Sequence, residues 1–237
     1  MADLTRNAQL AANLAAVEQR VSAACAAAGR SRADVTLVAV SKTWPASDVA
    51  LLRDLGLQHF GENRDAEAAQ KAADVPDVRW HFVGTVQSNK ARSITSYADV
   101  VHSLDRPGLV DALSRGAVRA GRNVDVLIQV DLDEAPHRGG ARPEDVPRLA
   151  DLAAAADSLR LAGLMAIAPL GTDPAPAFAR LMSVADAVRR EHPGATVVSA
   201  GMSGDLEAAV TAGANLLRVG TALFGSRPPL TASLRTR

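Results

Sequence analysis

Residues 36–45 read TLVAVSKTWP, a short apolar run that ends in a lysine. The stretch from Leu37 to Ser41 is apolar or small and is flanked by turn-forming residues, which is typical of a strand buried on both faces. Side chains alternate along a strand, so Lys42 shares a face with Val40 and Val38. If that face lines a barrel, burial favours a neutral amine that can attack a carbonyl group. The alternative is a lysine at a strand end whose charged head lies in water.

The composition of the chain narrows the class of protein. The 237 residues include 26 basic and 26 acidic side chains, so no net field favours nucleic acid or an anionic membrane surface. The single cysteine, Cys25, excludes an internal disulfide and is expected to be a small buried apolar residue. The N-terminal stretch lacks the pattern of a signal peptide, and no apolar run reaches membrane-spanning length. We therefore expect a cytoplasmic protein.

Apolar strands alternate with helices along the whole chain. The predicted strands cover residues 37–41, 59–63, 80–84, 100–104, 124–130, 161–167, 196–200 and 216–220. Helices are predicted at residues 5–28, 47–55, 64–73, 106–120, 143–155, 173–190 and 205–212, with a further one that ends near residue 97. Ser47 and Ser203 are the candidate N-cap residues of two of these helices.

This alternation predicts an α/β fold made of repeated βαβ units, because the strands are too apolar to have a solvated face. Eight units in a chain of this length predict a single (β/α)8 TIM barrel spanning residues 1–237. No outer helix follows the last strand, so we expect the N-terminal helix, within residues 1–30, to pack there, and residues 226–237 to form a loose tail. The competing architecture is an open doubly wound sheet, but the dinucleotide fingerprint G-x-G-x-x-G is absent.

Two neighbouring loops of the predicted barrel are rich in glycine. Functional side chains of parallel barrels lie just past the carboxyl ends of the strands. The turn at residues 201–204, with Ser203 and Gly204, follows the seventh strand, and Gly220 and Thr221 follow the eighth. Backbone N–H groups in these loops would form an anion site, and barrels often bind phosphate here. The alternative is that the glycines only serve tight turns; the matching features of both loops favour phosphate.

Arg218 lies inside the eighth strand, on the same face as Leu216 and Gly220. A buried arginine needs a partner, so it either pairs with a carboxylate such as Glu62 or faces a ligand. A lysine amine, a phosphate cradle and an arginine in one barrel mouth suit pyridoxal phosphate. Lys42 would form the Schiff base, the loops would hold the phosphate and the arginine would meet the ring nitrogen.

Six groups of motifs, taken together and in this order, resemble the small pyridoxal phosphate homeostasis proteins of the YggS/PROSC type, which are related to the N-terminal barrel of alanine racemase. The motifs are Val40–Thr43, Phe60–Asn63, Trp80–Gly84 followed by Gln87–Lys90, Gly163–Ile167, Gly201–Ser203 and Arg218–Gly225. The resemblance extends from about residue 10 to residue 227. It implies a single barrel of the alanine racemase N-terminal type, without the second β-domain of that enzyme.

The resemblance also implies roles for particular residues. Lys42 would be the Schiff-base lysine, Arg218 would face the pyridine nitrogen and Asn63 would lie near the ring. The cofactor-binding set that we predict is Lys42, Asn63, Ser203, Gly204, Arg218, Gly220 and Thr221. Gly204 stands where an acidic or polar residue is common in the family, and Arg138 is a candidate for a basic role in the loop at residues 131–142, where the family has a Lys-Ser-Gly type stretch.

The choice between an enzyme and a carrier depends on whether the chain supplies a second acid/base group. In alanine racemase, which this barrel resembles, a second domain supplies a tyrosine as that group, whereas the single tyrosine here, Tyr97, is predicted at the far end of its helix. An arginine at the ring nitrogen would also weaken the electron sink of the cofactor. The hypothesis is a carrier or buffer of pyridoxal phosphate (vitamin B6) without demonstrable turnover, a monomer or weak dimer with apo pyridoxal-phosphate enzymes as recipients.

Three alternatives remain. The first is a racemase or aldolase that uses the same Lys42, with His81 or His102 as the base, although a core histidine bonded to a neighbour is the simpler reading of each. The second is a metal site built from His59, His81 and His102, which no ligand spacing supports. The third is an interaction barrel without cofactor, which leaves Lys42 and Arg218 unexplained.

Overall fold

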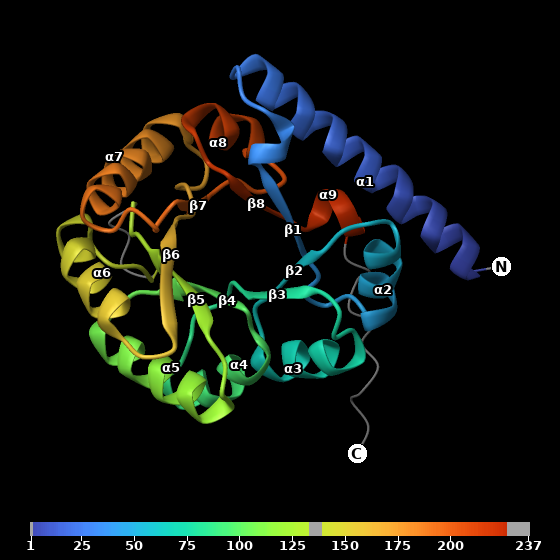
Figure 1. The fold of residues 1–237 in the computed structure, drawn as a ribbon. Coiled ribbons are helices and arrows are strands. Elements are labelled where there is room, and N and C mark those ends of the chain that lie inside the picture. The colour runs from blue at the N-terminus through green and yellow to red at the C-terminus, as the bar shows by residue number, and fades with distance from the viewer. Residues whose placement is uncertain (1, 133–138, 227–237) are drawn as a thin grey trace.

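A computed structural model describes residues 2–132 and 139–226 of the chain. Its eight parallel strands form one closed barrel in chain order, which excludes the open sheet (Figure 1). The strands are β1 (Thr36–Val40), β2 (His59–Glu62), β3 (Arg79–Phe82), β4 (Val100–Leu104), β5 (Val124–Gln129), β6 (Leu159–Met165), β7 (Val197–Ser199) and β8 (Leu216–Val219). The barrel closes where β8 pairs with β1, with Val38 opposite Arg218.

Helices surround the barrel on its outer side (Figure 1). They are α1 (Ala2–Ala27), α2 (Ala46–Asp54), α3 (Asp65–Asp74), α4 (Ala91–Tyr97), α5 (Pro107–Ala120), α6 (Val146–Ala155), α7 (Ala175–Glu191), α8 (Leu206–Ala212) and α9 (Thr221–Phe224), with 3-10 turns at Arg32–Asp34, Ser88–Lys90 and Pro143–Asp145. In the described ranges, none of these helices combines the length and the apolar character needed to cross a bilayer.

The N-terminal helix packs at the place where the outer ring is thin. Within the described residues after β8, up to residue 226, the chain makes one helix, α9, which is four residues long. The helix α1 runs across the outside of α8 and α9 (Figure 1). Leu10, Val17 and Val21 of α1 are fully buried in this contact, and Asn13 Nδ2 donates to the Leu223 carbonyl across 2.7 Å. The apolar stripe of α1 therefore covers the part of the barrel where the short α9 leaves the outer ring incomplete.

The interior of the barrel differs from the layer between strands and helices. The outer layer holds most of the buried apolar side chains, and Cys25 is among them, as predicted. Inside the barrel, a small apolar cluster of Val100, Leu127, Ala162 and Met165 lies beside a group of buried polar side chains.

Two predicted helix caps are wrong. Ser47 lies inside α2, whose N-cap is Pro45, and the helix begins without a side-chain cap. Asp205, not Ser203, is the N-cap residue of α8, which begins at Leu206, and the Ser203 hydroxyl accepts from the Ala222 amide instead. The predicted tail lies outside the described residues from residue 227 onward, and Arg138 also lies outside them.

Candidate functional site

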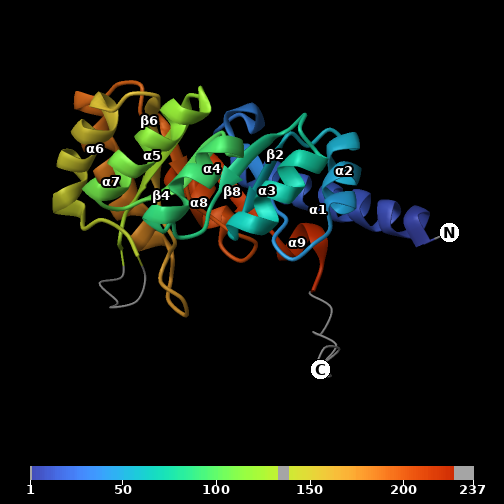
Figure 2. The same ribbon diagram turned by 90° about the horizontal axis from the view of Figure 1, so that it is seen from below.

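A cavity of about 490 Å³ opens at the carboxyl ends of the strands. This is the face from which α9 and the loop between β6 and α7 project (Figure 2). All seven residues of the predicted set line it, namely Lys42, Asn63, Ser203, Gly204, Arg218, Gly220 and Thr221. The other lining residues are Val40, Trp44, Val83, Gly84, Thr85, Met165, Ile167, Met202 and Gly225. The barrel thus brings together side chains that are up to 179 positions apart (42 to 221).

Lys42 is the second residue after the end of β1, in a tight turn that begins at Ser41. The Trp44 amide closes this turn on the Ser41 carbonyl at 3.0 Å, and Thr43 has φ of +71°, a left-handed conformation that a β-branched residue rarely adopts. Such local strain is commonly held at functional sites. Here the Thr43 amide is held by Glu67 Oε1, to which it donates across 2.6 Å.

A buried ionic network supports the turn from below. Lys71 Nζ donates to Glu62 Oε1 at 2.6 Å and to Glu67 Oε1 at 2.7 Å, and also to the Ser41 carbonyl at 2.8 Å. Ser41 Oγ donates to the same Glu62 oxygen at 2.7 Å. Burial raises the pKa of Glu62, an effect that Lys71 and Ser41 oppose. The suggested pairing of Glu62 with Arg218 is therefore wrong, because Lys71 takes this carboxylate.

Arg218 is 5% exposed and faces the cavity from β8. Its Nη1 donates to Ser199 Oγ at 2.6 Å and its Nη2 to the Ala166 carbonyl at 2.9 Å. Among the residues described, it pairs with no carboxylate. Burial lowers the pKa of Arg218 to about 10, an effect that Asp205 opposes, so the guanidinium is charged at neutral pH. A buried charge held only by neutral groups favours an electron-rich ligand atom in the cavity.

The two glycine-rich loops, after β7 and β8, meet at the cavity. Ser203 Oγ accepts a hydrogen bond from the Ala222 amide at 3.3 Å, so the serine joins the loops after β7 and β8. In the described part of the chain, the backbone N–H groups of Ser203, Gly204 and Thr221 form no hydrogen bond. Three free N–H groups at one cavity are suited to bind an anion.

Asn63 lines the cavity because β2 and β3 approach closely at their ends. A Cβ atom on Gly84 would lie 2.3 Å from the Asn63 carbonyl oxygen, so only glycine fits there. The hydroxyl of Ser103 bonds to the Gly84 carbonyl at 2.5 Å on the other side. The ends of β2 and β3 beside the cavity are thus fixed by the close approach of their backbones and by the Ser103 hydroxyl.

The histidines of the strands lie deeper in the barrel and bond to their neighbours, as the simpler interpretation predicted. His81 Nδ1 lies 2.8 Å from His102 Nε2, and both rings are buried. Burial lowers the pKa of both side chains, and so, for His102, does the charge of Arg218. Within the described ranges, no set of His, Cys, Asp and Glu side chains is arranged to hold a metal ion.

Tyr97 lies outside the barrel wall. Its hydroxyl donates to Asp65 Oδ1, between α3 and α4, at 3.4 Å, and burial together with Asp65 raises its pKa. This hydroxyl does not line the cavity, so it is not placed to exchange protons with a ligand there.

Sequence reasoning missed several residues that line or support the cavity. Trp44 could have been found, because it lies two positions after Lys42 at the same strand end. It stacks on Phe224 of α9 with ring centroids 5.9 Å apart, and the Arg6 guanidinium lies 4.6 Å from its ring centre. Ser199, which holds Arg218, could not have been found, since a serine in a strand gives no signal of what it bonds.

Comparison with known proteins identifies the family. Residues 12–228 match the alanine racemase, N-terminal domain, family. The pyridoxal phosphate homeostasis protein of Mycobacterium tuberculosis is 41% identical over 94% of each chain, and that of Escherichia coli is 38% identical over 92% of this chain and 97% of its own. The chain belongs to the pyridoxal phosphate homeostasis protein family.

Solved structures agree with this assignment. PipY of Synechococcus elongatus, a structure with pyridoxal phosphate bound, has a TM-score of 0.80 and 35% identity over 92% of this chain and 100% of its own. Alanine racemase from Clostridium difficile has a TM-score of 0.74 at 14% identity and is matched over 57% of its length, a likeness of fold alone. Family members of the homeostasis type thus match end to end, whereas the racemase continues beyond the barrel.

Proposed function

We propose that this protein binds pyridoxal 5'-phosphate as a Schiff base on Lys42 and serves its intracellular homeostasis as a carrier or buffer. The observation that carries the proposal is the cavity itself, where Lys42, Arg218 and the free N–H groups of Ser203, Gly204 and Thr221 face one space. The names of the relatives and the ligand of PipY support the same cofactor.

The chemistry of the cavity fits the three polar parts of the cofactor. Bound pyridoxal phosphate supplies an aldehyde that condenses with amines, and Lys42 is the amine at the wall. The free N–H groups suit the phosphate, and the Arg218 guanidinium suits a neutral, electron-rich pyridine nitrogen. Asn63 and Trp44 border the remaining space, where the ring would lie.

A carrier is favoured over an enzyme by the position of Tyr97. Its hydroxyl is bonded to Asp65 outside the barrel, and Arg218 disfavours the protonated pyridine that most such enzymes use. We further infer a cytoplasmic, monomeric or weakly dimeric protein that delivers the cofactor to apo enzymes; a sequence with one cysteine, and hence no internal disulfide, is in keeping with that compartment.

The test is visible absorbance of the purified chain with added pyridoxal phosphate, followed by borohydride reduction and peptide mapping. The expected result is an imine band that is trapped on Lys42 and lost in Lys42→Ala. Lys90→Ala is the matched control, because Lys90 is an exposed lysine outside the cavity. Trapping on another lysine would contradict the proposed site. Rapid racemisation or cleavage of free amino acids would contradict the carrier role and would show that the protein is an enzyme.

A further inference from the structure

A string of hydrogen bonds runs through the inside of the barrel behind Arg218. The Arg218 Nη1 group donates to Ser199 Oγ, and this oxygen lies 3.1 Å from His102 Nδ1. The other nitrogen, His102 Nε2, lies 2.8 Å from His81 Nδ1. His81 Nε2 in turn lies 2.9 Å from His59 Nδ1. We call Ser199, His102, His81 and His59 the histidine chain; it joins β7, β4, β3 and β2 to β8.

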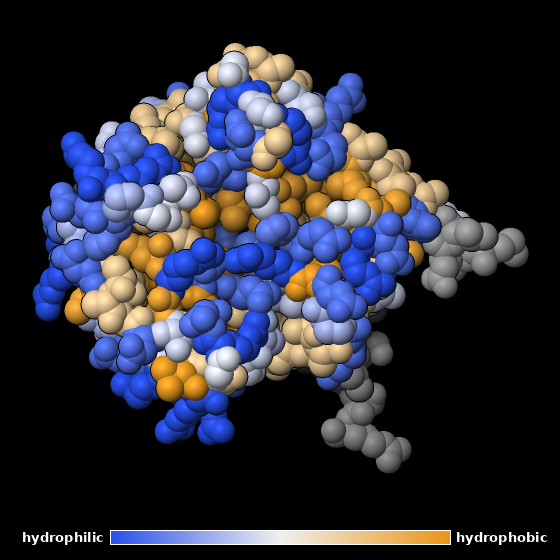
Figure 3. Space-filling view, in the orientation of Figure 1, coloured by the Kyte–Doolittle hydropathy of each residue, from blue (hydrophilic) through white to orange (hydrophobic). Residues whose placement is uncertain are grey.

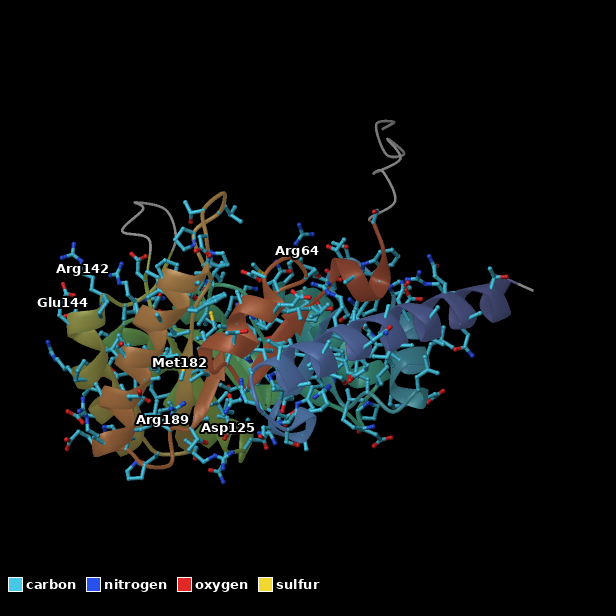
Figure 4. The ribbon with its side chains drawn as sticks, turned by 90° about the horizontal axis from the view of Figure 1, so that it is seen from above. Arg64, Asp125, Arg142, Glu144, Met182 and Arg189 are labelled. Carbon is cyan, nitrogen blue, oxygen red and sulfur yellow. The ribbon has the colours of Figure 1, made fainter. Side chains whose placement is uncertain are left out.

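The histidine chain connects the two ends of the barrel. Arg218 lines the cavity at the carboxyl ends of the strands, whereas His59 lines a second cavity of about 210 Å³ at their amino ends, with Asp125. Arg64, just past the end of β2, and Asp125, near the start of β5, lie at opposite edges in the side view (Figure 4). Hydrophilic residues gather over the centre of the amino-terminal face (Figure 3). His59 is half-buried there, so the chain ends where water has access.

The donors and acceptors of the histidine chain have one direction. An arginine can only donate, so Ser199 Oγ accepts from Arg218. Among the described residues, the other partner of this hydroxyl is His102 Nδ1, and we assign the single hydrogen of the serine to that nitrogen. A neutral imidazole carries one N–H, so the hydrogen of His102 is on Nε2 and points to His81. Because His81 Nδ1 accepts from His102, the one hydrogen of the neutral His81 ring is on Nε2 and points to His59 Nδ1. All three rings are therefore neutral Nε2–H tautomers.

The electrostatics of the interior agree with this direction. Burial lowers the pKa of His81 and His102. A proton on His102 or His59, and the charge of Arg79, would lower the pKa of His81 further, and the charge of Arg218 lowers the pKa of His102 further. Burial and Arg79 also lower the pKa of His59, while Asp99 opposes them. A doubly protonated ring has no acceptor nitrogen, so only neutral rings keep the links intact.

We propose that the histidine chain positions the Arg218 guanidinium for the ring of the bound cofactor and that His59 terminates this chain at the opposite face. Ser199 and the Ala166 carbonyl occupy one N–H of Nη1 and one of Nη2, which fixes the plane of the guanidinium and leaves other N–H groups for the ligand. The role of Arg218 toward the ring rests on the proposed function, whereas the direction of the chain does not.

The direction is tested without any ligand. Long-range nitrogen–proton NMR on the full, histidine-labelled chain at neutral pH should show His59, His81 and His102 as Nε2–H tautomers. On acidification, the links should fail first at His59, which faces Arg79, Asp99 and His81. An Nδ1–H tautomer or a charged ring at either buried position at neutral pH would overturn the proposal.

A matched pair of substitutions tests the terminal residue. The amide oxygen of asparagine stands where Nδ1 of histidine does, so His59→Asn keeps an acceptor for His81 Nε2, and His59→Leu removes it. We expect the His81 tautomer to be kept in His59→Asn and to become mixed in His59→Leu. The same spectrum for both variants would mean that His59 does not terminate the chain.

Ser199→Ala tests the link to Arg218. A lost hydrogen bond to a charged group should weaken the binding of pyridoxal phosphate about tenfold and shift the pH profile of its absorbance band. Thr95→Val is the control, because it removes a buried hydroxyl that bonds within α4. Equal affinity and an equal pH profile in both variants would overturn the positioning role. Wild type that forms no band would refute the proposed function instead, and the NMR result would still decide the direction.

Discussion

The backbone amide of Thr43 donates to the carboxylate of Glu67 across 2.6 Å. This bond holds the residue after Lys42 in a left-handed conformation, and Glu67 is itself held by Lys71. The backbone next to Lys42 is therefore held by a helix, α3, that contributes no residue to the cavity lining.

Glycine at position 43 should be tolerated. It adopts φ of +71° without steric cost, which removes about 1–2 kcal/mol of strain and offsets the chain entropy that glycine adds on unfolding. We expect Thr43→Gly to leave the free energy of unfolding unchanged or slightly higher, as measured by urea titration. Thr36→Gly in β1 is the control and should lose about 1 kcal/mol; an equal loss in both variants would show that Thr43 is not strained.

Removing the amine of Lys71 should be strongly destabilising. Lys71→Met leaves Glu62 buried without its cation, and breaking a buried pair on one side costs about 3–5 kcal/mol. Arg53→Met removes an ion pair with the exposed Asp54 and should change the free energy of unfolding by less than about 1 kcal/mol. Comparable losses in chemical denaturation of the two variants would mean that the network is not a buried support.

A methyl group at position 84 should force β2 and β3 apart. Its Cβ would overlap the Asn63 backbone, and overpacking costs about 1–3 kcal/mol. We expect Gly84→Ala to lower the melting temperature and to weaken pyridoxal phosphate binding. Gly108→Ala, in the first turn of α5 with open space around it, should leave both unchanged or raise stability by up to about 1 kcal/mol. Retained affinity in Gly84→Ala would show that the strand ends can move.

The free energy of unfolding should fall on acidification, because the buried His81 and His102 resist protonation in the folded protein. Burial lowers the pKa of His81 and His102 in the folded protein, whereas in the unfolded chain they bind protons below about pH 6.5. The unfolded state thus binds more protons in this range, so the free energy of unfolding falls as pH drops from about 6.5, by about 1.4 kcal/mol per pH unit for each histidine. Urea titrations at about pH 7.5, 6.5 and 5, on both sides of the ordinary pKa of histidine, measure the slope.

The control for this slope is a histidine outside the barrel. His102→Asn should reduce the slope, whereas His192→Asn, at the end of α7 beside Asp151, should affect it less. Equal slopes in His102→Asn and in wild type would contradict a neutral, buried His102.

The sequence could predict that the seven cavity residues lie close together, because the order of strands and helices places each of them just past the end of a strand or near it. Parallel strands of a barrel end on one face, so a residue known to follow a strand is known to lie near the others. Lys42, Asn63 and Thr221 could be placed this way without any contact information. The partner of Glu62 could not, because Glu62 bonds to Lys71 of the outer helix α3, whereas Arg218 faces the cavity inside the barrel. Ser203 failed as a helix cap for a similar reason, since its hydroxyl bonds across to Ala222.

By itself the sequence determined the barrel, its closure beside the N-terminal helix and the face that carries the site, because hydrophobic periodicity and turn residues are local properties of the chain. Only the tertiary structure decided which polar groups meet inside. His102 and Ser199 are 97 positions apart yet in contact, and a hydrogen bond depends on distances of a few tenths of an ångström that no pattern of residues encodes. The support of Lys42 and the chain behind Arg218 are therefore properties of the folded barrel.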